Sequence, residues 1–349
     1  MATNKQKLFI AYFLSKATFF GIGYSRLFNL SKSDTWISII IGMFFGMIIV
    51  WLIKRIMDAK KGLSLENYLK DKKIINMVIK ILLLCLCSYI FLEEIIVLTS
   101  FLTSFFLLNT PSIMISIPIV IVVFYVLRKG LQPFLKTNEI LFYISIFITI
   151  ITFLTLSIYP HMDYLKPILI TKYTNIIKSA FLYATYSTIP LLLIINLQND
   201  GKDLIKIYLA STLRILLLTM FILTIFGPQL TTIYRFPEYI VLKRIKLLSF
   251  VEKIESLLSI IYIFDNYILM TMSAFTIKKL LGNKMTAKIS FYSIIILITA
   301  IGTIFFTDNY VLSLKNYYIS PYIYLSGYLL IILLLLKTIK KKPKASNPS

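Results

Sequence analysis

About ten long apolar runs divide the chain, and no other feature of the sequence limits its fold as strongly. Most of them can cross a hydrocarbon core about 30 Å thick as helices that rise about 1.5 Å per residue. Since backbone polar groups in lipid must be satisfied within the chain, the runs predict an all-α, polytopic membrane protein. The chain is 58% hydrophobic, whereas soluble domains are about 45–50% apolar. The runs cover residues 8–26, 36–56, 74–106, 112–127, 140–159, 176–197, 204–226, 254–281, 289–306 and 322–336.

The basic excess of the chain is a signal of topology. Lys and Arg number 37 against 15 Asp and Glu, which gives a formal net charge of +22. If the N-terminus is cytoplasmic, most cations fall in inner loops, as the positive-inside rule requires. We therefore predict that both termini are cytoplasmic and that the cations attract anionic membrane lipid. Nucleic acid is not an expected partner, because the lysines are spread over separate loops. We expect one transmembrane domain over residues 1–336 and a basic, disordered cytoplasmic tail over residues 337–349.

The first run carries a charge and a weak point near its middle. Lys16 would lie at membrane depth, where a charge without a partner costs several kcal/mol. Gly21 and Gly23 follow, and neither has a side chain that favours helical backbone angles. A hydrophobic helix that is charged and broken at mid-depth is typical of binding sites in secondary transporters. The alternative is a kinked span whose lysine extends to the membrane surface.

The sixth run has a second weak point. Pro190 removes a backbone donor and clashes with the preceding turn, and hydroxyl side chains precede it, among them Thr185, Tyr186 and Ser187. Weak helices at the first and sixth positions predict a LeuT-like 5+5 inverted repeat with broken helices 1 and 6. In that architecture exposed amides hold a carboxylate and exposed carbonyls hold an ammonium or a cation. The scaffold therefore predicts a small zwitterionic ligand, such as an amino acid, at mid-membrane.

Three acids lie inside apolar runs. Glu93 and Glu94 are central in the third run, and Asp265 is central in the eighth, the inverted-repeat counterpart of the third. We expect one of them to pair with Lys16, either as a charge pair beside the site or as part of a proton relay. The alternative is that these charges only hold helices together.

Catalysis and cofactor chemistry are not expected. His161 is the sole histidine and falls in a predicted outer loop, so no Ser-His-Asp or Cys-His arrangement is expected. Cys85 and Cys87 would face different sides of a helix, which favours neither a disulfide nor a metal site. We expect no enzyme, no metal and no cofactor.

One segment between the seventh and eighth runs has helical periodicity. Within residues 236–250, Tyr239, Leu242, Ile245 and Leu248 recur on one face and cations lie elsewhere. The pattern predicts a short amphipathic helix at the outer membrane interface.

Several short motifs follow one another in the order found in a known family. Each is unspecific alone, but their order is specific, and they cover the chain from about residue 8 to residue 282. The motifs lie at residues 33–38, 108–111, 128–131, 138–142, 226–228, 236–237 and 250–255. In these motifs the sequence resembles the spore germination protein family, the B subunits of nutrient germinant receptors.

The resemblance implies an amino acid–polyamine–organocation transporter fold in the cell membrane or inner spore membrane. It implies a subunit that recognises a small germinant, often an amino acid, and works with an A-type membrane subunit and a C-type lipoprotein. Two alternatives remain open. One is an amino-acid permease that completes an alternating-access cycle, and the other is a structural subunit with a vestigial pocket.

The resemblance also implies where the pocket lies. The positions that match the family pattern are Thr18, Gly21 and Gly23 in span one, Cys87 and Phe91 in span three, Thr185, Tyr186 and Ser187 in span six, and Leu269 and Ser273 in span eight. Ordinary helix packing is the alternative for the last three groups. The chain departs from the family in having Ser187-Thr188-Ile189 where an acid is common, and Lys16 is unusual. A buried lysine there is placed to substitute for a ligand ammonium or a coupling cation.

Overall fold

The computed structural model describes residues 3–60, 62–63, 65–69, 74–197, 200–244, 255–282, 285–307 and 310–340, and within them it is helical without a β-strand. The elements are α1 (Asn4–Leu14), η1 (Ala17–Phe19), α2 (Ile22–Ser31), η2 (Lys32–Asp34), α3 (Thr35–Lys60), α4 (Leu65–Tyr68), α5 (Ile74–Phe105), α6 (Ser112–Lys129), α7 (Leu131–Leu156), η3 (Met162–Leu165), α8 (Tyr173–Thr188), η4 (Pro190–Asn196), α9 (Leu204–Ile233), α10 (Pro237–Arg244), α11 (Glu255–Leu281), α12 (Met285–Ala300), η5 (Ile301–Thr307) and α13 (Tyr310–Lys340).

The predicted class, an all-α membrane protein, is confirmed. Within the described ranges, 9 helical segments are long and apolar enough to cross a membrane. The first of these segments, Gly23–Lys60, joins α2 to the second predicted span, whereas α1 is not among them because the interruption leaves it only 11 residues long. The third and eighth spans, α5 and α11, pack along each other, as counterparts in an inverted repeat.

The first interruption follows from its sequence. After α1 ends, Lys16 has φ −121° and ψ −17°, and a short 3₁₀ turn follows. Gly21 then has φ +73° and ψ −80° and begins α2. Side chains disfavour such a positive φ, so glycine is suited to this position.

The second interruption lies at Pro190. α8 ends at Thr188, and the chain continues as the 3₁₀ segment η4. A cation supplies hydrogen bonds that a continuous helix would have supplied, because Lys60 Nζ donates to the carbonyls of Ile195 and Leu197. The prediction that the first and sixth spans are broken is therefore confirmed.

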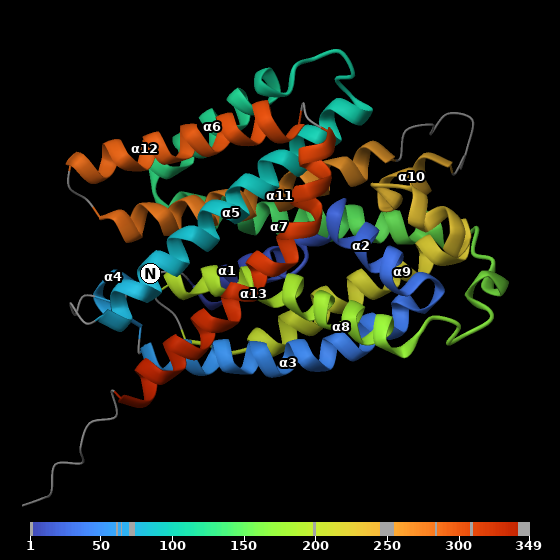
Figure 1. Ribbon diagram of the computed structural model, residues 1–349, viewed down its shortest axis with the longest axis horizontal. Helices are drawn as coiled ribbons and strands as arrows, with labels where there is room; N and C mark the ends of the chain where they lie inside the picture. The colour runs from blue at the N-terminus through green and yellow to red at the C-terminus, as the bar shows by residue number, and fades with distance from the viewer. Residues whose placement is uncertain are drawn as a thin grey trace, which may run out of the picture.

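The helices run side by side between two ends of the molecule (Figure 1). The N-terminus, α4 and the C-terminal end of α13 lie at one end, on the left, whereas η3 and α10 lie at the other. Both termini of the described chain therefore lie at the same end, which fits an even number of crossings.

α3 and α8 approach closely, which joins the second span to the broken sixth span. A Cβ added to Gly42 of α3 would lie 2.5 Å from the carbonyl oxygen of Ala180 in α8. This glycine lets the backbones meet, as small residues do between membrane helices. The contact fixes α8 beside α2 and α9, which also pack on α3.

Candidate functional site

The two broken helices meet directly. The Thr18 hydroxyl, in η1, donates a hydrogen bond of 2.9 Å to the carbonyl oxygen of Tyr186 in α8. Thr18 is 7% exposed and Tyr186 is 1% exposed, so the bond lies in the interior. A Cβ on Gly23 would lie 2.7 Å from the Thr18 carbonyl oxygen. Three of the residues predicted for the pocket are thus close neighbours.

Lys16 pairs with Asp265, one of the three acids considered from the sequence. Its Nζ lies 2.5 Å from Oδ1 and 2.7 Å from Oδ2 of Asp265. Both side chains are buried, with 1% and 0% exposure. Nζ also lies 5.1 Å from the ring centroid of Tyr12 and 4.8 Å from that of Phe13, distances suited to cation–π attraction. The pair joins the broken first span to α11.

The other two acids occupy different surroundings. Glu93 Oε1 accepts a hydrogen bond of 2.5 Å from Ser320 in α13, and Arg26 donates to the same hydroxyl at 3.1 Å. Glu94 is 3% exposed, and the structure gives it no hydrogen bond to any other residue that it describes. A buried carboxylate without such a bond is unfavourable unless a proton or a cation accompanies it.

The amide at the break of the first span has a carboxylate partner. The backbone N–H of Gly21 donates a hydrogen bond of 2.6 Å to Oε1 of Glu238 in α10. Glu238 is 1% exposed, and its Oε2 has no hydrogen-bond partner within the described chain. Gly21 is the N-cap of α2, so the carboxylate lies at the positive end of that helix dipole.

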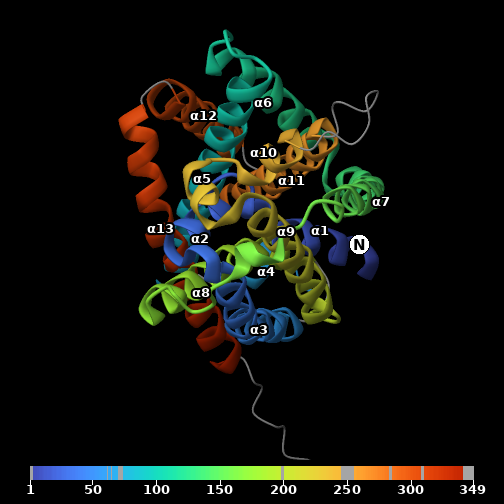
Figure 2. The same ribbon diagram turned by 90° about the vertical axis from the view of Figure 1, so that its right-hand side faces the viewer.

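α10 closes this end of the molecule over the break. It packs against α2, α9 and α11 and lies across the end of the bundle in Figure 2. The ring centroid of Tyr239 in α10 lies 4.4 Å from that of Phe105 in α5, and the ring of Phe236, just before α10, lies 5.3 Å from that of Phe101. The expected interfacial position needs revision, since Tyr239 and Leu242 are buried in the protein. Residues 245 and 248 lie outside the described part of the chain.

The remaining predicted pocket residues lie on neighbouring helices and contact other partners. Thr185 lies 2.9 Å from the Tyr328 hydroxyl of α13, and Ser187 lies 3.1 Å from the Tyr208 hydroxyl of α9. Ser273 donates to the carbonyl of Met270 within α11. Cys87, Phe91 and Leu269 are fully buried on α5 and α11.

Glu238 was missed by the sequence analysis, together with the Ser320 hydroxyl. An acid in the first turn of a helix is ordinarily a solvated residue that complements the helix dipole, and Glu238 directly follows Pro237. The nearby Phe236-Pro237 motif marked a turn, but nothing in the sequence indicated that the turn folds inward.

Burial raises the pKa of the Glu238 carboxyl to about 8 from its ordinary 4.5, while the hydrogen bond from Gly21 opposes that shift. The folded protein thus retains a proton between these pH values that the unfolded chain has released. We expect stability to fall as pH rises from about 4.5 to about 8, by up to about 1.4 kcal/mol per pH unit. Thermal unfolding at pH 5–9 measures this dependence.

The matched variant for this pH dependence is Glu238→Gln, which keeps the size of the side chain and removes its titration. Its unfolding should vary less with pH over the same range. Equal slopes in the two proteins would assign the dependence to another group. Tyr24 of α2 and Tyr262 of α11 are titratable groups that interact with Glu238, and Arg235, which precedes α10, interacts with Tyr262.

Two cavities open elsewhere. One, of about 740 Å³, lies between α2, α3, α8 and α13, with Arg26, Phe45 and Phe181 in its lining. The other, of about 240 Å³, lies between α6 and α12. Neither is lined by Thr18, Gly21 or Tyr186. Among the described residues, no three His, Cys, Asp or Glu side chains are grouped to hold a metal ion.

Comparisons with known proteins agree on one family. Residues 9–311 match the family model described as "Spore germination protein". The chain is 24% identical over 270 residues to spore germination protein KB of Bacillus subtilis, covering 72% of each chain. It is 26% identical over 244 residues to spore germination protein XB of Bacillus anthracis, covering 66% of this chain and 67% of that one.

Among solved structures, a mutant manganese transporter of Eremococcus coleocola matches over 95% of both chains, with 14% identity and a TM-score of 0.41. The same transporter in complex with an aromatic bis-isothiourea substituted compound matches over 97% of both chains, with 15% identity and a TM-score of 0.40.

Proposed function

Because the chain belongs to the spore germination protein family, we propose that it is the membrane subunit of a spore nutrient germinant receptor. It recognises a small germinant, an amino acid, at mid-membrane, and it resides in the inner spore membrane with both termini cytoplasmic. The observation that carries this proposal is the direct meeting of the two interrupted helices, at Thr18 and Tyr186.

Two charge features of the buried interior support a zwitterionic ligand. The N-terminus of α2 offers backbone amides, which suit a carboxylate. Glu94 is a buried acid with no hydrogen bond to the rest of the described chain. The ammonium group of a ligand would compensate the negative charge of its carboxylate. Lys16 already has Asp265 as its partner, so it stabilises the broken span without needing a ligand.

Binding at this point is suited to signalling. A germinant that contacts both broken spans favours one packing of the bundle over another, and it shifts the population by its differential affinity for the two states. An A-type membrane subunit and a C-type lipoprotein are the proposed partners that receive this shift.

An amino-acid permease is the second candidate, because interrupted helices that meet at mid-membrane are typical of secondary transporters. Uptake of labelled amino acids into proteoliposomes containing the purified chain separates the two. A receptor subunit should bind an amino acid without sustained uptake, and it should copurify with A- and C-type subunits from spore membranes. Sustained uptake without copurifying partners would support the permease instead.

A further inference from the structure

The N-terminus of α2 is a carboxylate site that the chain fills with its own side chain. Gly21 N–H donates to Glu238 Oε1 at 2.6 Å, and both residues are buried. α2 has 10 residues, enough for its first turn to carry the unpaired amides and positive potential that attract anions. Such a terminus can bind a free anion, but here its partner is a carboxyl group that belongs to α10.

Two observations distinguish this arrangement from ordinary packing. First, Glu238 Oε2 has no hydrogen bond to any described residue, although a buried carboxylate oxygen normally has one. Second, Gly21 has no side chain, and a Cβ there would lie 2.5 Å from Cε1 of Phe236. Phe236 can therefore approach the break closely only because residue 21 is a glycine. This approach brings Glu238, whose Oε2 has no hydrogen-bond partner among the described residues, to the Gly21 amide.

We propose that Glu238 is an internal ligand that occupies the carboxylate position of the germinant site, and that a germinant binds there by displacing Glu238 and releasing α10. This inference rests on the proposed function. It assigns a carboxylate to the germinant, because the positive end of the α2 dipole favours an anion over the Glu238 carboxyl, which keeps its proton at neutral pH.

The exchange has a direct effect on affinity. While Glu238 occupies the amide, only the fraction of molecules with α10 released is competent to bind, and the apparent dissociation constant rises by the inverse of that fraction. Loss of one hydrogen bond that leaves a buried amide unpaired changes such an equilibrium by about 10- to 100-fold. α10 also packs on α9 and α11, and the rings of Phe236 and Tyr239 contact α5. Release of α10 therefore transmits the occupancy of the site to the rest of the bundle.

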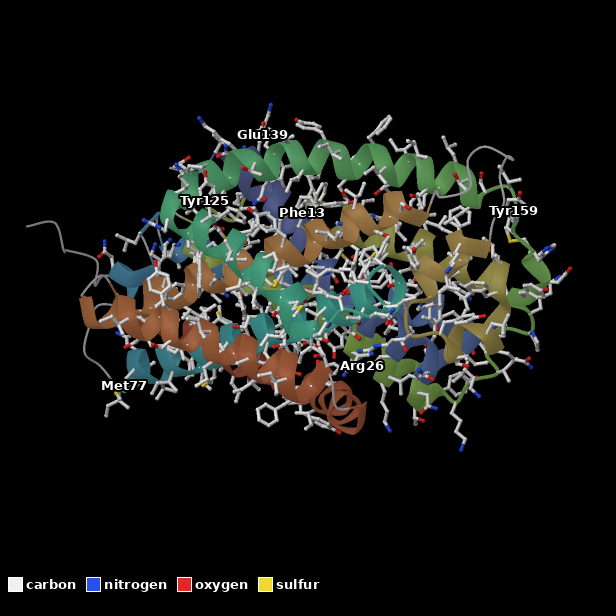
Figure 3. All side chains as sticks on the ribbon, turned by 90° about the horizontal axis from the view of Figure 1, so that it is seen from above. Phe13, Arg26, Met77, Tyr125, Glu139 and Tyr159 are labelled. Atoms are coloured by element: carbon white, nitrogen blue, oxygen red, sulfur yellow. The ribbon has the colours of Figure 1, made fainter. Side chains whose placement is uncertain are left out.

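Hydrogen exchange of the purified full chain in nanodiscs tests the proposal, with acetate as the probe. In Glu238→Ala, the peptide containing the Gly21 amide should exchange about 10- to 100-fold faster than in the wild type. Acetate should restore protection in this variant, and acetamide, its uncharged counterpart, should not. Acetate should leave the wild type unchanged, because Glu238 already holds the amide. Glu139→Ala, which removes an acid at the edge of the bundle on α7 (Figure 3), is the control and should behave as the wild type.

Unchanged exchange in Glu238→Ala, or equal effects of acetate and acetamide, would overturn the proposal. If that variant does not fold, Glu238→Gln serves in its place, because its amide oxygen still accepts a hydrogen bond. It should show a smaller increase in exchange that acetate again reverses, and the absence of both effects would also reject the proposal. These measurements need no germinant, so they stay informative if the chain proves not to be a receptor.

Discussion

Replacing Lys16 by Met should lower the free energy of unfolding by about 3–5 kcal/mol, because it leaves Asp265 buried without its cation. Asp265 is 0% exposed, and Lys16 Nζ is within 2.7 Å of both of its carboxylate oxygens. Asp265→Asn should be destabilising for the complementary reason. The double variant Lys16→Met/Asp265→Asn should regain most of the loss, because neither charge remains. Thermal unfolding in nanodiscs measures all three proteins.

An exposed ion pair provides the control for this prediction. Lys166 Nζ and Asp163 Oδ1 are 3.4 Å apart with side chains 72% and 91% exposed. Lys166→Met should change stability by about 0–1 kcal/mol, as expected for a solvated pair. If Lys16→Met were as mild as Lys166→Met, the buried pair would not hold the broken span against α11.

Gly21→Ala should raise the nutrient concentration for half-maximal germination by about 100-fold, at normal protein levels. The added Cβ would lie 2.5 Å from Phe236 at a residue with φ +73°, which combines overpacking with backbone strain. The clash with Phe236 also weakens the packing of α10, so the expected loss comes from the backbone strain, which moves the residue-21 amide away from the geometry that binds a carboxylate. Spores carrying the variant are assayed over a dilution series of a nutrient mixture.

Gly130→Ala is matched to this variant in backbone strain. Gly130 has φ +98°, and an added Cβ meets no atom within 4 Å. It lies between α6 and α7, away from the broken helices. Spores with Gly130→Ala should germinate normally. If Gly21→Ala spores also did so, the chain would act as a structural subunit whose pocket is vestigial.

The fold could be predicted because its causes are local in the sequence. Lipid allows few backbone arrangements, so the apolar runs indicated the spans directly. Gly21 and Pro190 marked the interruptions, since one has no side chain and the other no backbone donor. Boundaries were less exact, and α9 continues to Ile233 past a non-helical Gly227.

The site could be predicted only in part because its contacts join distant segments. Lys16 required an acid, but Glu93, Glu94 and Asp265 are equally central in their runs, and only the packing of α1 on α11 selects Asp265. Glu238 gave no signal, because a first-turn acid is common on solvated helices. Thr185 and Ser187 lie in the predicted helix, but helix rotation directs them to Tyr328 and Tyr208.

The most direct measurement is a structure of the receptor complex determined by cryo-electron microscopy with a bound amino acid. The amino acid is chosen as the one that most raises the unfolding temperature of the purified chain. The account predicts ligand density between Gly21 and Tyr186, with its carboxylate at the N-terminus of α2. Density in the cavity between α2, α3, α8 and α13, with Thr18 still bonded to Tyr186, would contradict it.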